Sequence, residues 1–179
     1  MAKAKRARSG GDTRRRAEDI LARMTLEEKS AQICSIAVAS VLDGRKVSRE
    51  KCAAVLAGGI GQISRLGGDN DFEPHEIAAA TTAIQAFLTT KTRLRIPAIV
   101  HEECLSGYMV RHATTFPEAI GLAGTWDPAL IEEITGSIAK LMRAVGAHQG
   151  LAPLFDVARE PRWGALRRPS ARTRTSSRR

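Results

Sequence analysis

The sequence predicts an α/β fold in a chain of 179 residues, which is about one domain's length. Helical patterns alternate with short apolar segments, and these segments lack the polar alternation of a strand with one solvated face. Strands of this kind, separated by amphipathic helices, are typical of a parallel sheet covered on both faces. Periodicity leaves two architectures open, a doubly wound sheet and part of a (β/α)8 barrel.

The N-terminal elements have clear signals at their ends. Residues 1–12 are rich in Lys, Arg, Ala and Gly, and we expect them to be disordered. A helical pattern begins at Thr13. Thr25 predicts the start of a second helix, because Glu28 follows three residues later and completes a capping box. The apolar stretch over 36–42 is compatible with a strand or with more helix.

The later elements follow from N-cap residues, from a proline in a first helical turn and from glycine stops. We expect, in order, a helix from Ser48 to Gly58, a strand over 60–64, a loop over 67–70, a helix from Pro74 to about Thr90, a strand over 97–100, a helix from Asp127 to about Val145 and a short apolar segment over 151–157.

The net charge of +9 lies at the two ends of the chain. Residues 1–16 and 165–179 each carry +6, which leaves −3 for the part between them. Two basic ends on a mildly acidic body do not form a basic face or groove. A nucleic-acid or anionic-surface binding module, acting through the basic termini, is nevertheless kept as the alternative function.

The three cysteines are scattered without metal-ligand spacing, and we interpret them as free thiols in a reducing cytoplasm. Without clustered Cys or His ligands, we expect no metal and no cofactor. No apolar run is long enough to span a membrane, and no apolar stretch of the secretory type follows the basic N-terminus. We therefore expect a cytoplasmic protein that binds neither membrane nor nucleic acid.

Several motifs in a fixed order carry a resemblance to a known family. They read RLRIPAIVHEECLSGYM, ATTFPEAIGLAGTWDPALIEEI and GAHQGLAPLFDVAREPRWG, with MTLEEKSAQ and GGIGQISR nearer the N-terminus. Over residues 20–164 the chain resembles the N-terminal domain of glycoside hydrolase family 3, which includes β-glucosidases and β-xylosidases. Any one motif is weakly specific, whereas their shared order is highly specific.

The resemblance implies a (β/α)8 barrel with its active site at the C-terminal ends of the strands. It also implies a retaining mechanism, in which two carboxyl groups about 5–5.5 Å apart act as nucleophile and as acid/base. The implied substrate is a β-linked glucoside or xyloside. The sequence does not indicate an oligomeric state.

The resemblance implies two substrate-binding residues in this chain. Glu103 follows the predicted strand over 97–100 and matches an acidic residue that holds sugar hydroxyls in the first subsite. Arg159 matches an arginine of the same family that also contacts the sugar. Two departures from the family pattern are Ser106, where His is common, and Glu160, where Asp is common.

The remaining candidate side chains have structural interpretations. We interpret His101 as a hydrogen-bonded histidine at the end of a strand rather than a general base, and Glu102 as structural. Trp126 and Trp163 are interpreted as packing residues rather than as platforms for sugar rings.

The resemblance stops after Gly164, where the family continues with a run similar to RAEETFGEDPYLVA. Deleting one base from codons for that run yields thirteen consecutive residues of this chain, from Ala165 onward. We therefore expect 165–179 to be an out-of-frame, disordered basic tail. Sequencing of the downstream DNA in all three frames tests this expectation.

The expected domain division is therefore a disordered N-terminus over 1–12, a partial barrel domain over 13–164 and the tail. The family's catalytic nucleophile and acid/base both correspond to positions beyond Gly164, so no catalytic residue is assigned. We expect an incomplete barrel, derived from a glycoside hydrolase, that is inactive by itself.

Overall fold

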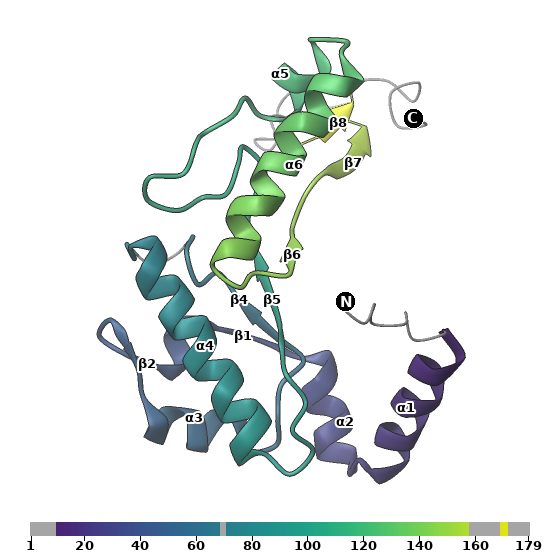
Figure 1. Ribbon diagram of the computed structural model, residues 1–179, viewed down its shortest axis with the longest axis vertical. Helices are drawn as coiled ribbons and strands as arrows, with labels where there is room; N and C mark the ends of the chain where they lie inside the picture. Colours follow the sequence, from purple (N-terminus) through teal and green to yellow (C-terminus); the bar gives the residue numbers. More distant parts are fainter. Residues whose placement is uncertain (1–9, 69–70, 158–168, 172–179) are drawn as a thin grey trace, which may run out of the picture.

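The computed structural model describes residues 10–68, 71–157 and 169–171 (Figure 1). Its centre is a four-stranded sheet with the order β1-β4-β5-β6. The four strands are β1 (Ser35–Ala37), β4 (Gln62–Ser64), β5 (Ile99–Glu102) and β6 (Gln149–Gly150). All neighbouring pairs are parallel.

The order of these strands decides between the two architectures that periodicity left open. Strands lie beside one another in the order in which the chain makes them, with no reversal. A doubly wound sheet has a reversal at its switch point, whereas a barrel keeps the chain order. The sheet is therefore the opening part of a (β/α)8 barrel and not a doubly wound sheet.

Each crossover between the parallel strands contains a helix. They are α3 (Arg49–Leu56) before β4, α4 (Pro74–Lys91) before β5, and α6 (Pro128–Ala144) before β6. The apolar faces of all three helices join one buried cluster with Ile63 of β4 and Val100 of β5. Burial of this shared surface is the main favourable term that holds the helices on the sheet.

Other elements surround this framework: α1 (Gly10–Arg23), α2 (Leu26–Ile33), the 3-10 helix η1 (Val38–Val41), β2 (Leu42–Asp43), β3 (Lys46–Val47) and α5 (Ala119–Ala123). β2 and β3 form an antiparallel pair. The apolar stretch over 36–42, left open by the sequence, is therefore divided between the end of β1, η1 and the start of β2.

The predicted caps are confirmed at three helix starts. Thr25 and Glu28 form the expected capping box at α2, and the Ser48 side chain accepts from the amide of Lys51 at α3. The Asp127 carboxylate accepts two amide N–H groups at the start of α6. These bonds satisfy amides that have no partner within a helix, so each fixes where its helix begins.

The two sides of the sheet differ in cover. Ile63, Val100 and Glu102 face the helices and are buried, whereas alternate residues face the side that a barrel would enclose. On that inner side Ser35 and Ala37 are exposed and Ile99 is 46% exposed. The inner side of the sheet is therefore open at Ser35, Ala37 and Ile99, whereas His101 on the same side is buried.

Both predicted disordered ends need partial correction. α1 begins at Gly10 rather than Thr13, with Asp12 in its first turn, where a negative charge is favourable. In the tail, Pro169–Ala171 form strand β8, which pairs with β7 (Leu154–Val157). An unpaired strand edge accepts such pairing, because its backbone groups otherwise lack partners.

The strand predicted over 97–100 has other bounds in the structure. β5 covers Ile99–Glu102, and the predicted apolar segment over 151–157 is divided between the loop after β6 and β7.

Among the described residues, none of the helices has the length and apolarity that a membrane crossing requires.

Candidate functional site

The C-terminal edge of the sheet brings together side chains from two loops. β4 ends at Ser64 and β5 at Glu102, so Arg65 and Glu103 are the next residues along the chain. Because the two strands are parallel, both residues emerge at the same edge. This is the edge at which barrel enzymes place their active sites.

Glu103 lies at this edge and forms an ion pair with Arg65. The Arg65 Nη2 to Glu103 Oε1 distance is 3.1 Å, and the Glu103 side chain is 17% exposed. Because the Arg65 side chain is 43% exposed, the ion pair contributes little to folding stability. Its main effect is to orient the carboxylate, since charge-assisted hydrogen bonds are short and directional.

The backbone of Arg65 is unusual. Its φ of 57° is in the left-handed region, which non-glycine residues rarely adopt. The Arg65 amide donates to the carbonyl oxygen of His101 at 3.1 Å, which ties the residue to β5. Sequence reasoning missed Arg65, and nothing in GGIGQISR indicates either the left-handed backbone or the pair with a residue 38 positions away.

His101 is buried at the end of β5, as its structural interpretation expected. Its Nε2 lies 3.2 Å from the hydroxyl oxygen of Ser35 on β1. Burial lowers the pKa of His101, and Arg65 adds to this effect while Glu103 opposes it. The imidazole is therefore neutral at neutral pH, and its hydrogen bond links strands on either side of β4.

Glu102 is completely buried, with 0% exposure, and its structural interpretation is confirmed. Its Oε1 accepts from the amide of Gly67 at 3.0 Å and from the hydroxyl of Tyr108 at 3.4 Å. Burial raises the pKa of Glu102, and the amides of residues 66–68 and the Tyr108 hydroxyl oppose that rise. Because its side chain faces the helices, Glu102 does not share the exposed edge with Glu103.

The remaining sequence-predicted residues lie away from the Arg65–Glu103 pair or outside the described residues. Arg159 lies outside the described residues, as do Glu160 and Trp163. Trp126 is 88% exposed, so its interpretation as a packing residue is wrong. It lies just before the N-cap of α6, with a φ of 54°. Trp126 is in the turn that leads into α6, and its left-handed backbone conformation leaves the indole ring in solvent.

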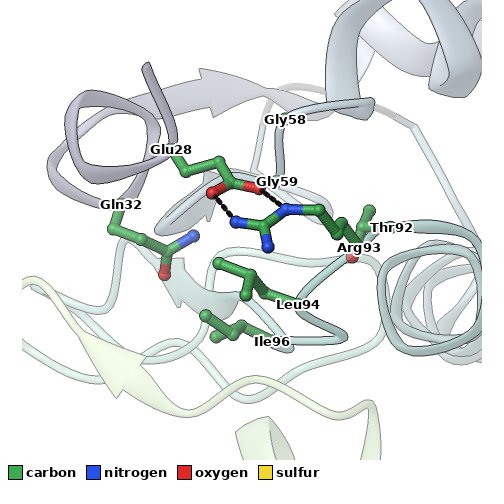
Figure 2. Close-up of a pocket in the computed structure, with 8 residues that line it drawn as sticks. All are labelled: Glu28, Gln32, Gly58, Gly59, Thr92, Arg93, Leu94 and Ile96. Atoms are coloured by element: carbon green, nitrogen blue, oxygen red, sulfur yellow. Dashed lines mark hydrogen bonds and ion pairs between the residues drawn. The ribbon is translucent and has the colours of Figure 1, made fainter. Parts of the chain in front are cut away.

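The opposite edge of the sheet holds a small cavity of about 10 Å³. Figure 2 shows that it is lined by Glu28, Gln32, Gly58, Gly59, Thr92, Arg93, Leu94 and Ile96. These residues lie on the segments that lead into β1, β4 and β5, which places the cavity at the N-terminal ends of the strands. Its volume has room for about one water molecule and for no sugar ring.

The side chains around this cavity hold the fold together. The Arg93 guanidinium binds both oxygens of Glu28, with Nε to Oε1 at 2.9 Å, and also donates to the carbonyl of Arg23. These hydrogen bonds, followed by the Thr25 amide, hold the pKa of Glu28 below its usual value. The N-terminal edge of a barrel is the stability edge, and this network agrees with that division.

Within residues 10–68, 71–157 and 169–171, no group of three or more His, Cys, Asp or Glu side chains is arranged to hold a metal ion. The three cysteines are free.

The fold and the edge that carries Glu103 define a class of protein. Parallel strands in chain order, joined by helices, are the opening strands of a (β/α)8 barrel. A carboxylate oriented by an arginine at their C-terminal edge is placed where barrel enzymes contact their substrates.

The chain belongs to glycosyl hydrolase family 3. The model described as "Glycosyl hydrolase family 3 N terminal domain" matches residues 25–175. The resemblance predicted from the motifs is thereby confirmed. The matched range runs beyond Gly164, where the motifs stop. The change of reading frame stays a prediction.

Named relatives agree with this assignment. A periplasmic β-glucosidase/β-xylosidase of Dickeya chrysanthemi is 32% identical over 162 residues, covering 83% of this chain and 24% of that protein. A β-glucosidase structure from Erythrobacter marinus matches with a TM-score of 0.76 at 30% identity, covering 87% of this chain and 20% of that one.

A third match shows the fold alone. The structure of a β-N-acetylhexosaminidase from Beutenbergia cavernae matches with a TM-score of 0.66 at 21% identity, covering 83% of this chain and 46% of that one. The chain thus spans about a quarter of the length of the first curated relative. The nucleic-acid alternative receives no support from any of these comparisons.

Proposed function

We propose that this chain supplies the opening strands and one substrate-binding edge of a retaining β-glycosidase that acts on β-linked glucosides or xylosides. The observation that carries the proposal is Glu103, held by Arg65 at the C-terminal edge of a family 3 sheet. The names of the glucosidase and xylosidase relatives support the choice of sugar class.

The chemistry of Glu103 suits the recognition of a sugar. A carboxylate accepts hydrogen bonds only, and each sugar hydroxyl offers one donor. Hydroxyl-to-carboxylate bonds are about twice as strong as neutral ones, so two of them fix the orientation of a ring. Arg65 occupies one side of Oε1 and leaves Glu103 partly exposed for such a ligand.

The proposal assigns no catalysis to the described residues. Retaining hydrolysis needs two carboxyl groups about 5–5.5 Å apart on either side of the scissile bond. Glu102 cannot supply the second one, because it is completely buried and faces the helices. Arg159, the second proposed sugar contact, lies outside the described residues.

A cytoplasmic location also stays a prediction, and the Dickeya relative is periplasmic by its name.

Calorimetric titration of glucose and xylose into the purified chain tests the proposal. We expect weak binding that Glu103→Gln reduces about tenfold, because a neutral amide replaces the charged acceptor. Glu50→Gln is the matched control, since this exposed carboxylate lies on α3, away from the C-terminal edge. Equal affinity of the Glu103→Gln variant and the unaltered chain would contradict the proposed role.

A chromogenic assay separates binding from catalysis. With p-nitrophenyl β-glucoside and β-xyloside we expect no hydrolysis above the uncatalysed rate. Turnover by this chain would show that it contains a nucleophile and an acid/base, contrary to the proposal.

A further inference from the structure

The loops that carry Arg65 and Glu103 are joined beneath the surface by one buried carboxylate, that of Glu102. Glu102 is the last residue of β5, and its side chain points away from the edge on which Glu103 emerges. Its Oε1 receives the amide of Gly67 from the loop after β4 and the hydroxyl of Tyr108 from the loop after β5. A single oxygen therefore connects both loops.

Tyr108 and Gly67 interlock around this oxygen. Tyr108 is buried, and burial together with the neighbouring Glu102 raises the pKa of its phenol, which therefore stays protonated and donates. A Cβ on Gly67 would lie 2.7 Å from the Tyr108 hydroxyl oxygen, so only glycine lets the two loops approach this closely. The close approach fixes the loop after β4 against the loop after β5.

The connection bears directly on Arg65. Its left-handed backbone is strained for a residue with a side chain and persists only where neighbouring bonds determine it. Those bonds lie on both sides: the Arg65 amide donates to His101, and two residues later the Gly67 amide donates to Glu102. Loss of the acceptor at Glu102 removes the bond that fixes the loop two residues after Arg65.

We propose that Glu102 is a positioning residue for the carbohydrate site. By holding Gly67 and Tyr108 it keeps Arg65 in its left-handed conformation, and Arg65 in turn orients the Glu103 carboxylate. Glu102 acts through its buried acceptor oxygen and touches no substrate. The sugar-binding consequence rests on the proposed function, whereas the geometric consequence does not.

Two variants of Glu102 separate its acceptor oxygen from its volume. Glu102→Leu keeps a similar volume but leaves the Gly67 amide buried without an acceptor, which is the costly arrangement. Glu102→Gln keeps an acceptor oxygen at the same place. Ile84→Val, a mild change in the buried face of α4, is the control for a general loss of stability.

The first measurement is made on the full chain without sugar, by NMR. We expect Glu102→Leu to raise the exchange rate of the Gly67 amide about tenfold relative to that of the Leu88 amide in α4. The guanidinium signals of Arg65 should shift away from their positions in the unaltered chain, because Glu103 is no longer held at Nη2. Glu102→Gln and Ile84→Val should keep both readouts near those of the unaltered chain. An unchanged Glu102→Leu variant, or equal losses in Glu102→Gln, would overturn the proposal.

The second measurement is the affinity for glucose and xylose. We expect Glu102→Leu to weaken it about tenfold, Glu102→Gln to change it less than about twofold, and Ile84→Val to leave it unchanged. A chain that binds neither sugar refutes the proposed function, while the NMR readouts still decide whether Glu102 positions Arg65. A Glu102→Leu variant that binds as tightly as the unaltered chain contradicts the positioning role.

Discussion

Gly61 lies where β4 begins, and its missing side chain lets α2 end against the sheet. Its amide donates to the carbonyl of Ala31 at 2.9 Å. A Cβ at this position would lie 1.9 Å from the carbonyl oxygen of Gln32. That atom belongs to the backbone, so no side-chain rotation relieves the clash.

We predict that Gly61→Ala lowers the free energy of unfolding by about 3 kcal/mol, because the backbone of α2 or β4 must shift. Gly136→Ala on α6 is the matched control. A Cβ there meets nothing within 4 Å, and alanine in a helix interior is favoured by about 0.5–1 kcal/mol. Thermal unfolding of both variants checks the prediction, and similar midpoints for the two would contradict the close approach.

The raised pKa of Glu102 leads to a second prediction, on how stability depends on pH. Because burial raises its pKa above the usual value of 4.5, its carboxyl contributes stability at low pH that is lost as the pH rises through the folded-state pKa. Glutamine does not titrate. The stability of Glu102→Gln relative to the unaltered chain should therefore increase from pH 4.5 to pH 8, as measured by urea unfolding at the two pH values. A pH-independent difference would show that Glu102 titrates normally.

Among the elements, the helices were predicted best. Thr25, Ser48 and Asp127 each place a side-chain acceptor at a helix start, and the helices begin where those residues predict. Such caps are local, so a single sequence reveals them. α5 was missed, because its N-cap Glu118 makes no side-chain capping bond and the element has only five residues.

Strand positions and side-chain pairing depend on distant parts of the chain. β5 lies two residues later than predicted, because its bounds follow from pairing with β4 and β6 rather than from its apolar residues. Of the site, only Glu103 was placed beforehand, through the family motif. Arg65 and the Gly67–Tyr108 contacts need two loops brought together by the parallel sheet, and no local pattern encodes that.

The stability of α4 at low pH depends on the carboxylate of Glu76 in its first turn. Hydrogen bonds from Arg45, followed by the Glu73 amide, lower the pKa of Glu76 to about 2. A carboxyl with a depressed pKa contributes stability that is present above its unfolded value and is lost as the pH falls through the folded value. The loss should therefore fall between pH 4.5 and about pH 2.

We predict that Arg45→Met weakens this acid dependence, since Glu76 then titrates closer to its usual value. Circular dichroism during acid titration of the unaltered chain and the variant checks it. Lys46→Met serves as the control, because this neighbouring cation is not among the groups that shift the Glu76 pKa. Parallel acid curves for the unaltered chain and Arg45→Met would contradict the role of the ion pair.

At the level of the whole molecule, two features favour association between chains. They are the exposed residues on the inner face of the sheet and its two edge strands, β1 and β6. Unpaired parallel edges and exposed apolar groups such as Ile99 favour association between chains. We predict marginal stability and concentration-dependent aggregation of the isolated chain. Light scattering during a thermal scan measures both, and a cooperative transition of a soluble monomer would contradict this prediction.

The proposed site lies at the C-terminal ends of the strands, so a bound sugar should contact that end of the sheet. The two ends of the strands carry different side chains. Arg65 and Glu103 lie at the C-terminal ends, and the Glu28–Arg93 network lies at the N-terminal ends. NMR titration of the labelled chain with xylose or glucose reads both edges at once. We expect shifts of the amides over 65–68 and 103–109, with the amides of Gly59 and Arg93 unchanged. Shifts confined to Gly59 and Arg93 would contradict this expectation.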